Sequence, residues 1–392
     1  MNPFHDYYGI EWYLILLAWS AIALGSHFYQ VGFVVRLIRL GKDDDRFNSW
    51  KQRLTEFLRD WLGQRKVVQD KVAGYAHALI FWGFLLLVSD IVDLGTGGLL
   101  QALLSNIQLD GIWNLIVDLG YAMATIGILI ALYRRIIIRP AKLKGASIEG
   151  PLILLAILGI VLTAFIVEAG NMIGEETKYN PWEPIGVLFA KQMDGMDHDT
   201  IASMVDISYW LHMVLIGGFL IEIPQTKHSH IIGTIPNVMF QDHDPMGTMI
   251  PMQTDENNEA VKTDDLDFDN LTLGVNKFAD FTWRQLSDGW ACTACARCQD
   301  VCPAYNSGKT LNPMQIVLDV KDYGREHGSL LLTGKDPEET MVDRFTPDAI
   351  WACTTCYACV EACPVHIEHV PKLTDTRRHL VMEASDFPEE LQ

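Results

Sequence analysis

The chain is poor in positive charge, and it lacks the motifs of several large enzyme classes. Its 392 residues carry 30 Lys and Arg against 49 Asp and Glu, which gives a formal net charge of −19 at pH 7. This balance argues against nucleic acid as a partner, because phosphate binding requires clustered Lys and Arg. The sequence also contains no phosphate-binding glycine loop, no dinucleotide-binding fingerprint and no nucleophile triad. Substrate chemistry of those kinds is therefore not expected in this chain.

Cysteine is absent outside one region, since all eight cysteines fall in two runs near the C-terminus. Each run has the spacing C-x2-C-x2-C-x3-C-P, which is typical of proteins that hold two [4Fe–4S] clusters. In such pairs of runs, the fourth cysteine of each run ligates the cluster of the other run. The sequence therefore predicts one cluster ligated by Cys292, Cys295, Cys298 and Cys363, and a second cluster ligated by Cys353, Cys356, Cys359 and Cys302.

Other uses of cysteine fit this pattern poorly. A disulfide framework is typical of short secreted chains, and structural zinc usually takes two separated pairs of ligands. No Cys-x-x-Cys-His sequence occurs, which excludes a covalently attached c-type haem. Because thiolate ligands persist in a reducing compartment, we expect the cysteine-containing end of the chain to be cytoplasmic.

Five apolar segments are each long enough to cross a bilayer, which takes about 20 residues. Core helices of a soluble protein are rarely this long and apolar five times in one chain. The sequence therefore predicts a multi-pass membrane domain. The five segments are Trp12–Val35, Val72–Ile91, Ile112–Ile138, Gly150–Ile173 and Met204–Ile223.

Lys and Arg are concentrated in two of the loops between these segments, whereas the opposite loops contain only Lys178 and Lys191. The positive-inside rule then predicts a protein of the cytoplasmic (inner) membrane, with its N-terminus outside and its cysteine runs in the cytoplasm. The basic residues are Arg36, Arg39, Lys42, Arg46, Lys51, Arg53, Arg59, Arg65, Lys66 and Lys71 in one loop, and Arg134, Arg135, Arg139, Lys142 and Lys144 in the other.

Histidines in or near these segments are candidate ligands, because ionisable groups at membrane depth are costly. His77 lies near the start of the second segment, and His212 lies within the fifth. His228 and His230 follow Pro224, back at the cytoplasmic side. His77 and His230 should therefore lie at similar depth, as ligation of one haem by two histidines requires. The alternative is that these histidines only form hydrogen bonds with neighbouring helices.

The membrane half resembles the gamma subunit of respiratory nitrate reductase and the cytochrome b subunit of heterodisulfide reductase. In that family, b-haem ligands lie in the second and fifth of five spans. His77 matches the cytoplasmic-side ligand of the second span, and His212 and His230 match the fifth-span pair. The resemblance implies a b haem held by His77 and His230, with His228 as the alternative to His230. A second b haem on His212 needs another ligand, because the expected position is Leu87, and His27 in the first span is the candidate.

Carboxylates near the outer face could exchange protons with a bound quinone. Glu168 is the best candidate for such a proton relay, because the segment around it is otherwise apolar and uninterrupted. The alternative for acids of this kind is solvation at the ends of helices.

The C-terminal part resembles the alpha-helical ferredoxin domain found in the iron–sulfur subunits of succinate dehydrogenase and in the dicluster ferredoxin-like subunit of heterodisulfide reductase. The motifs that carry this resemblance are Trp283 before the first run, Gly308-Lys309 after it, Trp351 before the second run, and Arg377-Arg378. Nearly the whole chain resembles the N-terminal part of membrane iron–sulfur oxidoreductases of the electron-transfer-flavoprotein:menaquinone oxidoreductase type. Those relatives continue into a module with CCG cysteine motifs, for which this chain has no spare cysteine.

These patterns predict a mainly α protein with a five-helix transmembrane cytochrome b bundle (1–235), an acidic linker (236–276) and an alpha-helical ferredoxin domain with two [4Fe–4S] clusters (277–392). The predicted function is electron transfer between a cytoplasmic partner and menaquinone in the membrane. The partner would be a flavoprotein or a CCG-motif iron–sulfur subunit. Two alternatives stay open: a subunit of a heterodisulfide- or sulfite-reduction complex, and a membrane redox sensor that binds haem and clusters.

Overall fold

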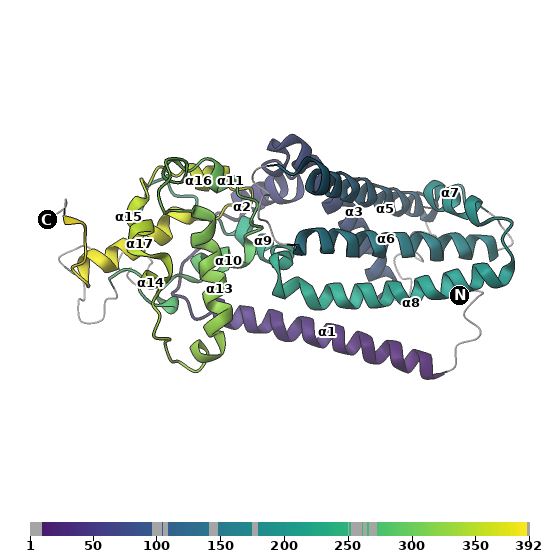
Figure 1. Cartoon of the computed structure of the whole chain (residues 1–392), viewed down its shortest axis with the longest axis horizontal. Coiled ribbons are helices and arrows are strands. Elements are labelled where there is room, and N and C mark those ends of the chain that lie inside the picture. The colour runs from purple at the N-terminus through teal and green to yellow at the C-terminus, as the bar shows by residue number, and fades with distance from the viewer. Residues whose placement is uncertain are drawn as a thin grey trace. The chain divides into compact units, whose positions relative to one another are not determined.

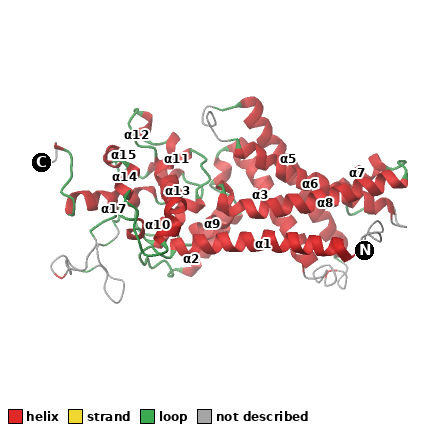
Figure 2. Ribbon diagram, turned by 60° about the horizontal axis from the view of Figure 1, so that its bottom comes forward, coloured by secondary structure: helices red, strands yellow, loops and turns green. Residues whose placement is uncertain are grey.

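The computed structural model describes residues 10–95, 109–140, 148–174, 179–249 and 273–389, with Leu104, Pro251, Val261 and Asp265 as isolated positions. Within these residues every regular element is a helix, and no strand occurs (Figure 2). The prediction of a mainly α protein is therefore confirmed. The chain divides into two compact units, each assembled from two stretches of sequence. Unit 1 contains Met1–Ser26 and Val67–Glu222, and unit 2 contains His27–Lys66 and Ile223–Gln392.

The long apolar helices of the chain match the predicted spans. Among the described residues, five helices are long and apolar enough to cross a membrane, so the chain is a multi-pass membrane protein. They are α1 (Ile10–Ile38), α3 (Lys71–Gly95), α5 (Asp110–Tyr133), α6 (Glu149–Gly174) and α8 (His198–Glu222). Helix α1 is shared, since its residues up to Ser26 belong to unit 1 and the rest to unit 2.

Unit 1 is built around four of these helices, packed in the order α3, α5, α6, α8 (Figure 1). Small residues allow α3 and α5 to approach closely, as is common between helices in membranes. A Cβ atom on Gly83 would lie 2.6 Å from the carbonyl oxygen of Gly120, and one on Gly127 would lie 2.6 Å from that of Ala76. The shorter α7 (Pro184–Met193) packs against α6.

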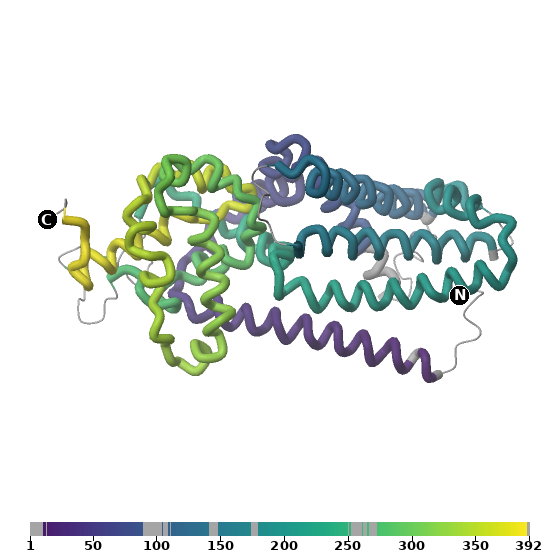
Figure 3. Tube along the Cα trace, viewed as in Figure 1, coloured from purple at the N-terminus to yellow at the C-terminus, as the bar shows by residue number. Residues whose placement is uncertain are grey.

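Unit 2 consists of shorter helices joined by loops. Figure 3 traces the early 27–66 stretch and the late 273–389 stretch, both of which belong to this unit. Its described helices of four or more residues are α2 (Trp50–Glu56), η1 (Phe57–Leu62), α9 (His230–Met239), α10 (Trp283–Ala291), α11 (Arg297–Asp300), α12 (Pro303–Asn306), α13 (Pro313–Leu331), α14 (Met341–Phe345), α15 (Pro347–Ala352), α16 (Ala358–Ala362) and α17 (His369–Met382).

The main core of unit 2 includes the end of α1. Leu37 is buried in the same apolar cluster as Phe278, Phe281 and Tyr323. The chain after α1 stays attached, because the Lys42 N–H donates to the Phe281 carbonyl (2.8 Å) and the Trp283 N–H donates to the Lys42 carbonyl (3.0 Å). The 27–66 stretch therefore belongs to the unit that carries the cysteines, although the sequence pattern assigned it to the membrane domain.

Part of the predicted acidic linker is ordered in unit 2. Helix α9 continues to Met239, and the Gln241 and His243 side chains both contact the Glu56 carboxylate, at 2.8 and 2.7 Å. Residues 252–260, 262–264 and 266–272, which carry most of the acidic charge of the linker, lie outside the described residues.

Candidate metal centres

The eight cysteines gather into two sets in unit 2, and none of them forms a disulfide. In the first set, Cys292 follows α10, Cys298 lies in α11 and Cys363 follows α16. Burial and then the neighbouring Cys295 thiol raise the pKa of the Cys363 thiol to about 12. Burial also raises the pKa of Cys298, followed by the thiols of Cys363, Cys292 and Cys295. Cys363, the fourth cysteine of the second run, also packs in one buried cluster with Cys292 of the first run.

The second set surrounds a cavity. The cavity has a volume of about 20 Å³ and is lined by Cys302, Cys353, Cys356 and Cys359, together with Leu311, Pro313 and the buried His369. Burial and the thiols of Cys353 and Cys302 raise the pKa of Cys359 to about 12. The fourth cysteine of the first run thus faces the first three of the second run. The crossed ligation of two clusters by these sets stays a prediction.

Both runs have the same backbone shape around their first two cysteines. The residues two and four positions after the first cysteine have positive φ: 51° and 64° at Ala294 and Ala296, and 52° and 60° at Thr355 and Tyr357. This left-handed conformation turns successive N–H groups toward one side and forms the concave anion sites found at many iron–sulfur centres. In the second run, the Thr355 N–H donates to the Cys353 sulfur at 3.4 Å. The repeated shape fits the residues to hold two anionic clusters.

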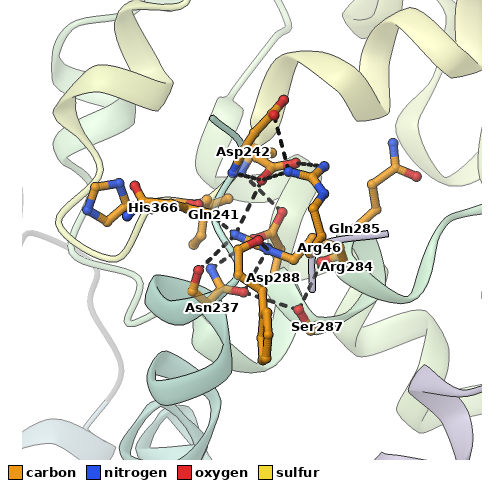
Figure 4. A network of polar contacts seen from close by, with 12 residues as sticks. Arg46, Asn237, Gln241, Asp242, Arg284, Gln285, Ser287, Asp288 and His366 are labelled. Atoms are coloured by element: carbon orange, nitrogen blue, oxygen red, sulfur yellow. Dashed lines mark hydrogen bonds and ion pairs between the residues drawn. The ribbon is translucent and has the colours of Figure 1, made fainter. Parts of the chain in front are cut away.

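A buried polar network connects the cysteine runs to α9 and to the 27–66 stretch (Figure 4). Arg284 and Asp288 are 2.5 Å apart and have fully buried side chains. Arg284 also donates to the Asn237 side-chain oxygen (2.8 Å), and Lys372 donates to Asp288. Burial alone would raise the pKa of Asp288, but the cations of Arg284 and Lys372 hold it well below its usual range. The sequence pattern did not predict this network.

Basic residues of the 27–66 stretch enter the interior of unit 2. Arg53 is 1% exposed and donates to the Gln241 carbonyl at 2.8 Å. The Lys66 ammonium donates to the Glu361 carbonyl at 3.2 Å, and Arg297 donates to the Lys66 carbonyl at 2.7 Å. In the sequence, Arg53 and Lys66 served only to predict the membrane topology by the positive-inside rule. They also fix this stretch to the segments that carry the cysteines.

Two of the candidate histidines have one ring nitrogen engaged with a backbone carbonyl. In α8, His212 Nδ1 lies 2.9 Å from the Ile160 carbonyl and 3.0 Å from the Thr163 hydroxyl, both on α6. His230 Nδ1 lies 2.7 Å from the Lys227 carbonyl. This arrangement gives the metal-ligating tautomer, in which Nδ1 donates and Nε2 carries the lone pair. Both histidines therefore fit a haem, although the contacts of His212 equally satisfy a purely structural role.

The remaining candidate histidines are distributed over both units. His77 is exposed, and the half-buried His27 meets the Phe28 ring edge-on at 5.7 Å. The His228 and His230 rings lie 5.7 Å apart. His77 and His212 belong to unit 1, whereas His27, His228 and His230 belong to unit 2. The pairing of these histidines around a haem stays a prediction.

Glu168 lies on α6, against the first turn of α7. A Cβ atom on Gly186 would lie 2.8 Å from the Glu168 Oε1 atom. The same turn is capped by the buried Asp118 carboxylate, which accepts the N–H groups of Ile185 (2.8 Å) and Gly186 (3.0 Å). Asp118 therefore has a structural role as a helix cap, and the proton relay through Glu168 stays a prediction.

Comparisons with known proteins agree with this arrangement. A family model described as a 4Fe-4S dicluster domain matches residues 285–364. The chain is 29% identical to the probable iron-sulfur-binding oxidoreductase FadF of Bacillus subtilis, over 97% of the chain and 57% of that protein. It is also 29% identical to the EtfAB:quinone oxidoreductase of Syntrophomonas wolfei, over 87% of the chain and 50% of that protein. It is 41% identical to a probable membrane-anchored ferredoxin of Chromohalobacter salexigens, over 33% of the chain and 22% of that protein.

No solved structure matches the chain. The chain spans about half the length of the first two relatives, at 57% and 50%. The predicted resemblance to membrane iron–sulfur oxidoreductases is confirmed by these relatives. Residues 285–364 form a 4Fe-4S dicluster domain, and the chain as a whole is similar to an iron–sulfur-binding oxidoreductase and to a quinone oxidoreductase.

Proposed function

We propose that this chain is a membrane electron-transfer subunit that passes electrons between a cytoplasmic redox partner and a quinone, through two [4Fe–4S] clusters and b haem. The observation that carries the proposal is the gathering of all eight cysteines into two crossed sets of four, in a chain with five potential membrane spans. A chain of this kind can pass electrons between a water-soluble redox partner and a redox carrier in the bilayer.

The residues of unit 2 are suited to the cluster part of this function. When bound, a [4Fe–4S] cluster supplies reversible one-electron transfer. The thiolates of each set would hold the iron atoms, and the backbone N–H groups near Ala294 and Thr355 would stabilise the negative charge. Cys295 and Cys356 are exposed, so each set has an edge that a redox partner can approach. We assign Cys292, Cys295, Cys298 and Cys363 to one cluster, and Cys353, Cys356, Cys359 and Cys302 to the other.

The haem and quinone parts rest on the sequence resemblance. We assign one b haem to His77 and His230, and a second to His212 with His27. The engaged Nδ1 atoms of His212 and His230 are consistent with these roles. A quinone is supported by the similarity to the EtfAB:quinone oxidoreductase of Syntrophomonas wolfei, and menaquinone is our proposal for its type. Glu168 is proposed to exchange protons with it.

The partner is proposed to be a cytoplasmic flavoprotein or a CCG-motif iron–sulfur subunit. With all eight cysteines assigned to two clusters, none remains for a further cysteine-ligated site in this chain. We place the cluster unit on the cytoplasmic side of the inner membrane, by the positive-inside rule and the need for reduced thiols.

The proposal predicts electron transfer to quinone without turnover of a soluble substrate. The full chain is purified anaerobically, placed in lipid nanodiscs and reduced with dithionite. Addition of a menaquinone analogue should oxidise the clusters, as followed by their visible absorbance and EPR signals. Addition of a disulfide substrate without a partner subunit should not. Clusters that stay reduced after quinone addition would contradict the proposed function.

The haem assignment predicts a difference between two neighbouring histidines. The reduced protein should show the alpha band of a b-type haem, and His230→Ala should remove most of it because the variant loses an axial ligand. His228→Ala is the matched control, since it lies two residues away in the same turn, and should keep the band. If His228→Ala lost the band and His230→Ala kept it, the haem ligand would be His228 and not His230.

A further inference from the structure

Lys321 is a buried lysine of α13 in unit 2, with 4% of its surface exposed. Its ammonium group donates to the Thr226 carbonyl at 3.1 Å and to the Ser229 hydroxyl at 3.2 Å. Both acceptors belong to the turn that leads directly into His230. A buried cation is costly unless its hydrogen bonds are satisfied, so this contact is a specific feature of the site. Lys321 therefore fixes the segment that carries His230.

The same lysine lies against the helix that leads into the first cysteine run. A Cβ atom on Gly289 would lie 3.0 Å from the Lys321 Cβ and 3.2 Å from its backbone nitrogen. The absence of a side chain at Gly289 therefore allows α13 to pack closely on α10, three residues before Cys292. The Ser229 hydroxyl, which accepts from Lys321, also donates to the Trp290 carbonyl at 3.1 Å. Lys321, Ser229 and the last turn of α10 thus form one connected set of contacts.

Helix α9 holds both ends of the first cysteine set in a similar way. Asn237 donates to the Asp288 carboxylate and to the Val365 carbonyl, each at 2.9 Å. Asp288 precedes Cys292 by four residues, and Val365 follows Cys363 by two. The second cysteine set is lined instead by residues of α17 and of the loop before α13, such as Val370 and Leu311. The contacts of Lys321, Ser229 and Asn237 therefore hold the His230 segment against the first cysteine set.

Electrostatics agrees with this geometry. The positive charge of Lys321 favours negative charge at the Cys292 sulfur. Asp288 also acts on this thiol, with the opposite sign to Lys321, but it is itself paired with Arg284 and Lys372. The charge of Lys321 also acts at His230. Lys321 thus acts on the first cysteine set and on His230 together.

We propose that Lys321 is a positioning residue that holds the His230 segment against the Cys292 run and favours the reduced form of the cluster assigned to Cys292, Cys295, Cys298 and Cys363. The inference rests on the proposed function, because it needs that cluster. Reduction adds one electron and one negative charge to the cluster, and it breaks no bond. A buried cation nearby stabilises the added charge. With an effective dielectric constant of about 20, one unit charge about 12 Å away changes the reduced-to-oxidised ratio by roughly tenfold.

The test is a potentiometric titration of the full chain, followed by EPR under anaerobic conditions. The two cluster signals are assigned with Cys295→Ser and Cys356→Ser, each of which alters one cysteine set. In Lys321→Met, the reduced-to-oxidised ratio of the first-set cluster at a fixed potential should fall about tenfold, because the stabilising cation is lost. The second-set cluster should titrate as in the wild type. Lys321→Arg keeps the positive charge, so the reduced-to-oxidised ratio of its first-set cluster should stay close to that of the wild type.

Three further measurements make the test decisive. Iron analysis must find both clusters in the variants, and Lys321→Gln replaces Lys321→Met if the latter loses iron. Ser229→Ala keeps the charge and removes one hydrogen bond, so it should change the ratio less than Lys321→Met. An unchanged first-set cluster, or an equal shift of both clusters, in an iron-replete variant would overturn the role of Lys321. Absence of both cluster signals from the wild-type protein would instead overturn the proposed function.

Discussion

Replacing Cys302 with serine is expected to remove the cluster of the second cysteine run and to leave that of the first run in place. Cys302 belongs to the first run in sequence, but its side chain lines the cavity with Cys353, Cys356 and Cys359. Loss of one thiolate ligand destabilises the cluster that it holds, so non-haem iron should fall from about eight to about four atoms per chain. Iron analysis and EPR of the anaerobically purified variant measure this change.

The matched control for this prediction is Cys298→Ser, four residues earlier in the same run. Cys298 is assigned to the same cluster as Cys292, Cys295 and Cys363, so this variant should lose the other cluster. The EPR spectrum that remains should therefore differ between the two variants. If both variants lose the same cluster, each run ligates its own cluster and the crossed assignment is wrong.

The parts of the fold that the sequence predicted are those with a repeated local signal. The five spans follow from long apolar runs, which few soluble helices share, and all five match helices of the structure. The two cysteine sets follow from a spacing that allows three thiols of a short loop to converge. The equal backbone conformations at Ala294 and Thr355 show the same loop built twice. Local signals of this kind do not depend on the rest of the chain.

The assignment of the 27–66 stretch to unit 2 had no such signal. Arg53 looks like an ordinary basic loop residue in the sequence, yet it is buried and donates to a carbonyl 188 positions away. Lys321 likewise sits in a helix with many polar residues, and nothing in its neighbours predicts contacts with Thr226 and Ser229. Long-range contacts between polar side chains and backbone carbonyls leave no periodic pattern. The sequence therefore predicted a 4Fe-4S dicluster domain but not the residues that position its cysteine runs.

The buried network beside the first cysteine set leads to the second large prediction. Asp288 lies between Arg284 and Lys372, and all three side chains are fully buried. Asp288→Asn removes the negative charge and leaves two buried cations facing a neutral amide. Breaking a buried ion pair in this way typically costs about 3–5 kcal/mol, because desolvated charge is left without compensation. The free energy of unfolding of the holoprotein should fall by about that amount.

The exposed ion pair between Lys277 and Asp336 in the same unit provides a control. These side chains are 58% and 44% exposed at a distance of 2.8 Å. Pairs exposed to this degree contribute about 0–1 kcal/mol, because water solvates both partners when the pair is broken. The free energy of unfolding of Lys277→Met should therefore be close to that of the wild type. Anaerobic denaturant titrations, followed by tryptophan fluorescence and by the visible circular dichroism of the clusters, compare the two variants.

A triple variant separates the cost of uncompensated charge from the value of the ion pairs themselves. Arg284→Met, Asp288→Leu and Lys372→Met together replace all three charges with apolar side chains of similar length. Because no unpaired charge remains buried, the triple variant should be more stable than Asp288→Asn, although it carries more substitutions. Neutral replacement also removes the hydrogen bonds of Arg284 to Asn237, so some loss relative to the wild type is expected. A triple variant that is less stable than Asp288→Asn, or an Asp288→Asn variant as stable as Lys277→Met, would contradict this account of the network.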